Sequence, residues 1–259
     1  MEMASGRSGG VQAIARAAAV LRALGPEALS LGALARATSL PRSTVQRIVE
    51  ALATEGFVEV GEGGVRPGWG LRRLAAAAQS NIAALVRPGL EALFEHTRES
   101  VDLSTGHGRE VAFLDRIISD QELRVVPIAD RPRPLHAMAN GKAILACMSD
   151  AQVVRLIGGK AARLTAATKT AMPDLLADLA SVRQTGFAYD WEEHAPGVCA
   201  IGTAIMVEGL PPHAVSLAVP ASRFNAGVET YQSALRECRN WMETALSRKS
   251  ARNEPTFRT

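Results

Sequence analysis

The stretch from Ser30 to Leu52 constrains the fold of this chain more than any other. Ser30 precedes a short apolar repeat that begins at Leu31, and its hydroxyl suits an N-cap. Residues 38–40, Thr-Ser-Leu, indicate a tight turn. Pro41 then fits the first position of another helix, where its missing N–H costs nothing. Two short helices joined by such a turn form a helix-turn-helix.

The second of these helices has two faces. Its apolar residues recur at i, i+3, i+4 and i+7 and form a predicted buried stripe of Val45, Ile48, Val49 and Leu52. Its polar residues include Arg42, Ser43, Thr44, Gln46 and Arg47. Arginine and glutamine bond base edges in the major groove, while serine and threonine hydroxyls reach phosphates. Each of these residues alone is better explained as an ordinary solvated helix residue, but the set on one helix favours DNA contact.

The flanking segments complete a winged helix-turn-helix domain over residues 11–69. A helical pattern runs from Val11 to Leu24 and ends at Gly25-Pro26. After the helix-turn-helix, residues 56–60 and 65–67 indicate two short strands around a glycine-rich turn. Arg66 in this hairpin suits a phosphate or minor-groove contact, and an ordinary exposed arginine is equally well supported. We expect residues 1–10 to be disordered.

Charge is distributed unevenly along the 259 residues. Residues 1–80 hold nine arginines and six glutamates, so the whole net charge of +3 lies there, and the remaining residues are neutral. A polyanion would therefore dock on the first third of the chain, although chance explains a surplus of three charges equally well. The three cysteines are far apart and give neither a disulfide framework nor a metal-ligand spacing, so we expect no metal, no cofactor and a cytoplasmic location. No apolar run is long enough to predict a membrane span.

The remaining two thirds predict an α+β domain. We expect a linker helix over residues 70–84, an effector-binding and oligomerisation domain over residues 85–248, and a disordered tail over residues 249–259. Trp69 next to the linker suits either a dimer contact or burial against its own domain. Pro88 is expected to start a separate helix. Strand-like segments precede, and then follow, a group of helical ones: strands at 100–105, 110–117, 123–128, 187–190, 198–207 and 214–219, and helices at 137–148, 151–157, 173–185 and 225–246.

Several motifs, in order, resemble the IclR family of transcriptional regulators. They are Leu29–Leu31 with Leu34-Ala35, Leu40–Arg47, Glu55–Val58, Pro134–Ala137 with Gly141–Ala143, Gly186–Glu193 with Pro196–Val198 and Ala200–Gly202, and Ser216–Pro220 with Ser222-Arg223. The resemblance spans residues 11–225. The wing departs from the family pattern because it is less basic, and Met206 and Val207 stand where an aromatic residue and Asp or Asn are usual.

The resemblance implies a GAF/PAS-like mixed sheet with flanking helices, a double-stranded DNA operator as partner, and a homodimer or a dimer of dimers. It also implies an effector pocket, for which we name Ala139, Asn140, Gly141, Asp190, Val198, Ala200, Ser216 and Ala218. The small residues at the helix start near Asn140 suit a carboxylate on free backbone N–H groups. Ala200 and Ala218 leave the pocket less polar than in relatives with hydroxyls there, which favours a bulkier organic acid, aromatic acids included.

Alternatives remain open at several residues. Asp190 and Glu193 suit helix caps or surface ion pairs as well as ligand contact, and Lys142 is expected on a solvated helix face. A small-molecule hydrolase or acid–base enzyme would use Asp190, Glu193 and His194, with Cys199 nearby and a vestigial helix-turn-helix. The chain shows no nucleophile elbow or phosphate loop in its sequence, so we expect no enzyme. A pure interaction or ligand-binding module is a third hypothesis, and repression and activation are both compatible with the sequence.

Overall fold

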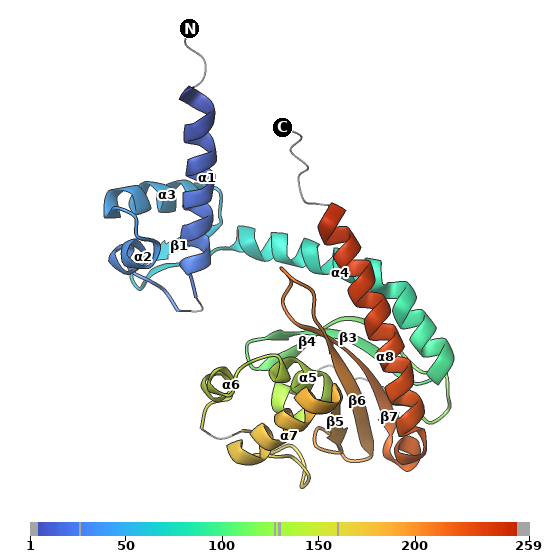
Figure 1. Ribbon diagram of the computed structural model, residues 1–259. Helices are drawn as coiled ribbons and strands as arrows, with labels where there is room; N and C mark the ends of the chain where they lie inside the picture. The colour runs from blue at the N-terminus through green and yellow to red at the C-terminus, as the bar shows by residue number, and fades with distance from the viewer. Residues whose placement is uncertain (1–4, 26, 127, 129–130, 160, 253–259) are drawn as a thin grey trace. The chain divides into compact units, whose positions relative to one another are not determined.

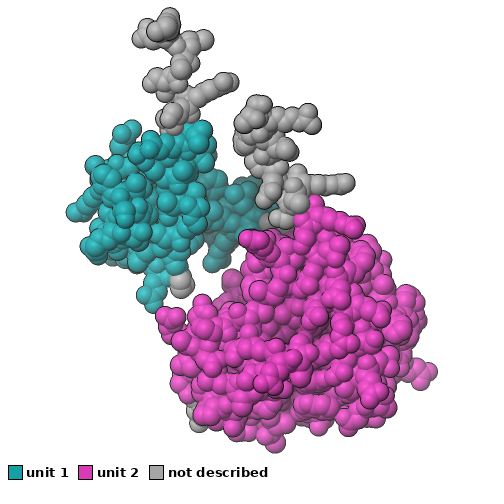
Figure 2. Space-filling model, viewed as in Figure 1, with its two compact units in different colours: residues 1–79 teal, residues 80–259 magenta. Residues whose placement is uncertain are grey.

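A computed structural model describes residues 5–25, 27–126, 128, 131–159 and 161–252. The chain divides into two compact units, Met1–Gln79 and Ser80–Thr259 (Figure 2). The division falls within the stretch 70–84, where the sequence predicted a linker. Each unit has its own hydrophobic core.

The first unit is a winged helix-turn-helix. Its elements are α1 (Ser5–Ala23), α2 (Leu31–Thr38), α3 (Arg42–Thr54), β1 (Val58–Gly61) and β2 (Gly64–Pro67). Ser30 caps α2 by accepting a hydrogen bond from the N–H of Ala33, as its position predicted. Ser39 ends α2 in the left-handed conformation and turns the chain toward α3. The buried stripe of α3 then packs on α1, α2 and β1.

The wing is tied to the segment before α2. Leu29 and Val65 exchange backbone hydrogen bonds of 2.9 and 2.8 Å, which adds a bridge beside the β1–β2 hairpin. Gly64 makes this approach possible, because a Cβ there would lie 2.6 Å from the carbonyl oxygen of Leu29, and its φ of +115° excludes most other residues. The wing is thereby fixed next to the start of the helix-turn-helix.

Three sequence expectations at helix ends are corrected. Helix α1 begins at Ser5, inside the stretch expected to be disordered, because adding turns to a formed helix costs less than nucleating one. Pro41 is the N-cap of α3 rather than its first residue, a shift of one position. Pro88 lies inside α4 (Trp69–Thr97), so the linker and the following helix are one element. Pro88 is exposed, and its ring faces away from the core that Val86 and Leu90 enter.

The second unit is built on a five-stranded antiparallel sheet with the order β4-β3-β7-β6-β5. The strands are β3 (Ser100–His107), β4 (Glu110–Ile117), β5 (Ala188–Trp191), β6 (Val198–Ile205) and β7 (His213–Pro220). The expected strand at 123–128 is wrong for the described residues 123–126 and 128, which form no strand. Leu123, Val126 and Ile128 are exposed there, so the segment has no covered face to pair.

Alternation along the strands gives the sheet two different faces. On β3, Val101 and Leu103 point to one face, where they meet α4 and the long helix α8 (Ala221–Arg252). Asp102, between them, points to the other face and lines a cavity. The same division holds on β7, where Leu217 belongs to the first core and Ser216 lines the cavity. One face is therefore a packed apolar layer and the other is left with small and polar side chains.

Helices cover both faces (Figure 1). The cavity side carries η1 (Leu135–Ala137), α5 (Ala139–Ala146), α6 (Asp150–Ile157) and α7 (Met172–Thr185). Helix α8 continues to Arg252, beyond the expected start of the tail at residue 249, because charged and small residues there still propagate a helix. Residues 253–259 of the expected tail lie outside the described residues.

Candidate functional site

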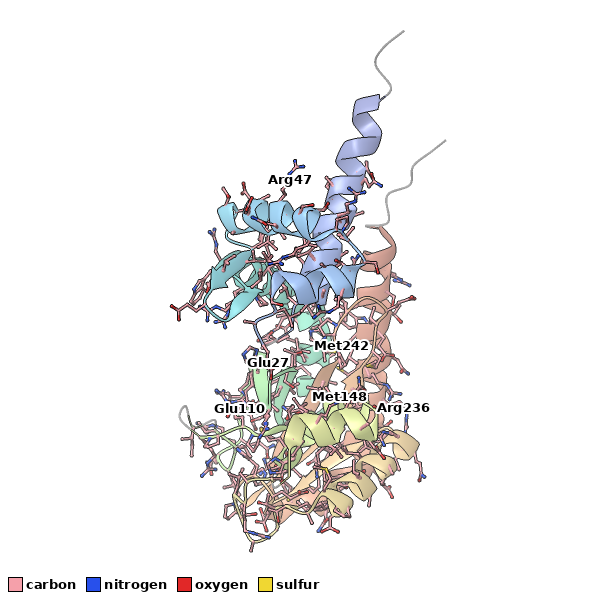
Figure 3. The ribbon with its side chains drawn as sticks, turned by 90° about the vertical axis from the view of Figure 1, so that its left-hand side faces the viewer. Glu27, Arg47, Glu110, Met148, Arg236 and Met242 are labelled. Atoms are coloured by element: carbon pink, nitrogen blue, oxygen red, sulfur yellow. The ribbon has the colours of Figure 1, made fainter. Side chains whose placement is uncertain are left out.

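The outer face of α3 carries the residues expected to contact DNA. Arg42, Ser43, Gln46 and Arg47 are exposed, and Thr44 is half-buried. Figure 3 shows the side chain of Arg47 extending away from its helix. This leaves a polar helix face of the length and width that enter a major groove.

Gln46 on α3 and Arg66 on the wing each have a side-chain partner in the free protein. Gln46 donates a 3.0 Å hydrogen bond from Nε2 to Glu50, one turn along α3. Arg66 pairs with Glu59 across the wing at 2.8 Å, with both side chains exposed. Each contact competes with a nucleic acid contact of the same side chain, and in water such exposed pairs are worth at most about 1 kcal/mol. The wing therefore supplies less free positive charge than α3.

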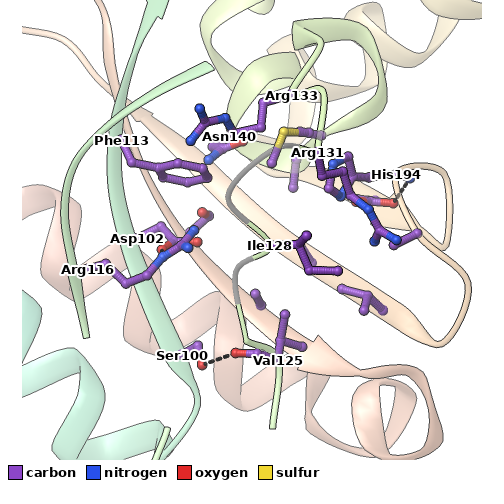
Figure 4. A pocket seen from close by; sticks show the side chains of 18 of the residues that line it. Ser100, Asp102, Phe113, Arg116, Val125, Ile128, Arg131, Arg133, Asn140 and His194 are labelled. Carbon is purple, nitrogen blue, oxygen red and sulfur yellow. Dashed lines mark hydrogen bonds and ion pairs between the residues drawn. The ribbon is translucent and has the colours of Figure 1, made fainter. Parts of the chain in front are cut away.

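A second site is a cavity on the small-residue face of the sheet, of about 100 Å³ (Figure 4). All five strands, the start of α5 and the loop after β5 contribute to it. Of the eight residues expected to bind an effector, seven line it: Ala139, Asn140, Asp190, Val198, Ala200, Ser216 and Ala218.

Gly141 does not line this cavity. A Cβ at Gly141 would lie 2.3 Å from the carbonyl oxygen of Leu135, so glycine is needed there to let η1 pack on α5. The N–H of Gly141 is already bonded to the side chain of Asn140 at 2.9 Å. The expected role of this glycine in binding a carboxylate is therefore corrected: its role is packing.

The register of the sheet arranges the cavity floor in two rows. In one row Asp190, Ala200, Ala218 and Ser100 stand side by side on β5, β6, β7 and β3. In the next row Gly202, Ser216, Asp102 and Arg116 do so on β6, β7, β3 and β4. Small residues lie on β6 and β7 in both rows, Asp190 lies on the edge strand β5, and the charged pair Asp102 and Arg116 lies on β3 and β4. The floor is therefore lined by small residues at its centre and is polar at its ends.

Asp190 forms one polar end. Its Oδ1 accepts backbone hydrogen bonds from Glu193 at 2.7 Å and His194 at 3.3 Å. Burial raises the pKa of Asp190 to about 7, although these two N–H groups and Lys142 favour the charged form. The carboxyl is therefore divided between its two protonation states near neutral pH.

Arg116 and Asp102 form the opposite end of the cavity floor, which the sequence did not predict. Arg116 donates from Nε to Asp102, a carboxylate that is 4 % exposed, and its guanidinium lies 4.1 Å from the ring centre of Phe113. Arg131 and Arg133 enter the cavity from the segment before η1. The signal that was available is the alternation of Asp102 with the apolar Val101 and Leu103, which places a carboxylate on the small-residue face.

Behind the cavity lies a cluster of buried charges. Lys142 is 0 % exposed and binds Glu193 at 2.6 Å and Asp178 at 2.8 Å, and Lys169 also reaches Asp178, at 2.7 Å. The expectation that Lys142 lies on a solvated helix face is wrong, because its position on α5 faces α7 and the loop after β5. The ion pair between Lys142 and Glu193 ties α5, which carries Asn140, to the loop after β5, which carries His194.

The residues named for an enzyme are engaged in structural contacts. His194 donates from Nε2 to the carbonyl of Pro132 at 3.0 Å, and burial lowers its pKa. Glu193 is held by Lys142 and Asp190 by backbone N–H groups. Cys199 is buried, and burial raises its pKa, which disfavours a thiolate. Among the described residues, no group of three or more His, Cys, Asp or Glu is placed to hold a metal ion, and no helix could cross a membrane.

A winged helix-turn-helix followed by an α+β domain with a cavity on one face of its sheet defines a class of DNA-binding proteins that respond to small molecules. Two family profiles match the chain, the IclR helix-turn-helix domain over residues 13–61 and the bacterial transcriptional regulator IclR C-terminal domain over residues 74–243. The chain belongs to the IclR family of transcriptional regulators. The resemblance drawn from its motifs is thus confirmed, as is the predicted fold class.

Relatives of known name support the same assignment. The chain is 40% identical to the HTH-type transcriptional regulator TtgV of Pseudomonas putida, over 95% of each chain. It is 37% identical to the HTH-type transcriptional regulator Rv1719 of Mycobacterium tuberculosis, over 84% of this chain and 86% of the relative. Among solved structures, an IclR homolog complexed with 4-hydroxybenzoate from Microbacterium hydrocarbonoxydans aligns with a TM-score of 0.59 and 25% identity, over 90% of this chain and 98% of that one.

Proposed function

We propose that this regulator binds an operator through α3 and that a small organic acid in the cavity of the second unit controls this binding. The observation that carries the proposal is the cavity itself, since residues far apart in the sequence meet there on the small-residue face of the sheet. An IclR homolog of the same fold is complexed with an aromatic acid. The proposed DNA contacts are Arg42, Ser43, Thr44, Gln46 and Arg47, with Arg66 in a lesser role.

The charges around the cavity favour an anion. Arg116, Arg131 and Arg133 line it against Asp102 and Asp190. Most of the other lining residues are apolar, including Phe113, Met138 and Val198. A small acid with an apolar body matches this combination, because the arginines stabilise its charge while the walls exclude water.

We propose a homo-oligomer as the DNA-binding form. A protein with one recognition helix per chain reads two half-sites, spaced by turns of the duplex, only as a dimer or a dimer of dimers. Trp69 is 68% exposed in the single chain and carries the guanidinium of Arg72 at 5.1 Å from its ring centre. An aromatic residue so exposed suits a contact between protomers. Because the partner is DNA, the protein would act in the cytoplasm, and we assign it no catalysis.

The test uses DNA from upstream of the gene that encodes this chain. We expect the full chain to bind labelled fragments in a fluorescence anisotropy titration, and a panel of aromatic and aliphatic acids to include members that change the affinity. Ser216→Leu fills the middle of the cavity floor and should abolish the response to acid while sparing DNA binding. A response that survives Ser216→Leu would contradict the placement of the effector.

A further inference from the structure

We infer that Arg116 is the anion anchor of the cavity and that the cavity selects a compact acid with a hydrogen-bond donor at its far end. The inference rests on the proposed function and specifies its ligand. It depends on the polar atoms that the fold leaves open toward the cavity.

Arg116 is held in place with donors to spare. Of its three side-chain nitrogens, only Nε has a partner within the described residues, the buried Asp102, while Nη1 and Nη2 have none there. The face of Phe113 fixes the plane of the guanidinium at 4.1 Å. A guanidinium oriented in this way presents a fork of N–H groups to a carboxylate without a large loss of side-chain entropy.

The other arginines are less well fixed. Arg131 and Arg133 lie on the segment between β4 and η1 rather than on a strand. Arg133 lies over Phe113 at the longer distance of 5.6 Å, and neither has a described side-chain hydrogen bond to orient it. A preorganised donor binds more tightly than a mobile one of equal charge, which favours Arg116.

Asp190 determines what the far end of the ligand can be. Its Oδ1 is occupied by two backbone N–H groups, while Oδ2 has no partner among the described residues. Above its pKa of about 7, Asp190 is mostly charged, and its open oxygen then accepts a hydrogen bond and repels a second negative charge. A hydroxyl or amino group is therefore favoured at this end and a second carboxylate is disfavoured.

The size and walls of the cavity limit the middle of the ligand. Its volume of about 100 Å³ sets one ring as the upper limit, because a cavity of roughly 150 Å³ is known to hold one benzene ring. Ala200 and Ala218 form a flat apolar floor between the charged ends. The ligand class is thus a small monocarboxylic acid with at most one ring and with a donor opposite its carboxylate.

The experiment measures the affinity of three probes by calorimetry on the full chain. The probes are 4-hydroxybenzoate, 4-hydroxybenzamide, which lacks the charge, and benzoate, which lacks the donor. We expect 4-hydroxybenzoate to bind roughly ten- to hundred-fold tighter than either of the others, the range that a charged hydrogen bond gives. Arg116→Gln should remove the preference over the amide, and Asp190→Asn should reduce the preference over benzoate.

Two further variants are matched controls. Arg133→Gln removes a less well fixed charge from the same cavity and should keep most of the preference for 4-hydroxybenzoate over the amide. Arg124→Gln removes an exposed charge outside the cavity and should keep all of it. Thermal unfolding checks that Arg116→Gln is folded, and Arg116→Lys should restore part of the preference. The inference is overturned if Arg116→Gln retains the preference, if Arg133→Gln loses it instead, or if none of the probes binds.

Failure of the proposed function has a different signature. If no acid in the panel alters the affinity of the wild-type chain for its DNA, the proposed function fails. If some acid does so while these three probes do not bind, only the ligand class is wrong.

Discussion

Lys142 shows how one buried charge organises the molecule at the scale of a residue. Replacing it with methionine leaves Glu193, which is 1 % exposed, and Asp178 without their central partner. We expect Lys142→Met to lower the free energy of unfolding by about 3–5 kcal/mol, the usual cost of breaking a buried pair from one side. Urea unfolding measures the change.

Lys169 provides the matched control for this prediction. It binds the same Asp178 at 2.7 Å but is 34% exposed in its side chain. Lys169→Met should cost less than about 1 kcal/mol, because water compensates an exposed pair. Equal losses for the two variants would show that burial does not set the strength of this cluster.

Asp190 predicts a pH dependence of stability. Its pKa of about 7 in the folded chain exceeds the ordinary 3.8, so between these pH values the folded state binds one proton more than the unfolded state. The contribution of Asp190 to the free energy of unfolding is therefore complete below about pH 4 and is lost as the pH rises through 7. The free energy of unfolding falls by up to about 1.4 kcal/mol per pH unit over this range.

Asp190→Asn removes this contribution. Relative to the wild type, the variant should therefore be more stable at pH 8 than at pH 5, in urea unfolding followed by tryptophan fluorescence. Asp174→Asn, at an exposed position on α7, is the control and should follow the wild type at both values. A difference between Asp190→Asn and the wild type that is constant with pH would contradict the assignment.

At the scale of a residue, the sequence predicted which residues line the cavity better than it predicted which side chains contact one another. Asn140, Asp190 and Ser216 were placed by motif, and they share a cavity. Lys142 was misplaced because α5 is covered on more than one side, and a short helix with buried charge has no clear amphipathic period. Arg116 was missed since its role depends on register with Asp102, a pairing that one strand's pattern does not contain.

At the scale of an element, the contact between η1 and α5 sets the position of Ala139 and Asn140, which line the cavity at the start of α5. A Cβ at Gly141 would meet backbone atoms of Leu135 at 2.3 and 2.5 Å. Backbone has little freedom to move away, so we expect Gly141→Ala to cost about 1–3 kcal/mol and to weaken acid binding. Gly159→Ala, where nothing lies within 4 Å, should change stability by less than about 0.5 kcal/mol. Equal unfolding midpoints for Gly141→Ala and Gly159→Ala would contradict the close packing of η1 on α5.

Elements with strong local signals were predictable. The cap at Ser30, the stripe on α3 and the alternating strands all follow from side-chain period and turn chemistry. The failures lie where tertiary contacts override local signals: Pro88 continues α4 at an exposed position, and residues 123–126 are β-prone yet have no neighbouring strand.

At the scale of the whole molecule, we assign DNA binding to one unit and effector binding to the other. The first 80 residues hold the entire excess of positive charge. A protein that binds phosphates with arginines releases counterions, so its affinity for DNA should fall steeply and linearly with salt on logarithmic axes. The neutral remainder of the chain should contribute little to that slope.

The central claim is that the polar face of α3 contacts the duplex, and one measurement tests it most directly. Anisotropy titrations of upstream DNA compare the wild type with Arg42→Ala, Arg47→Ala and the control Arg22→Ala, an equal loss of charge on α1, at several salt concentrations. Each α3 variant should lose about 1–3 kcal/mol of binding free energy, while Arg22→Ala loses far less. Affinities for Arg42→Ala and Arg47→Ala equal to that of the wild type at every salt concentration would contradict the claim.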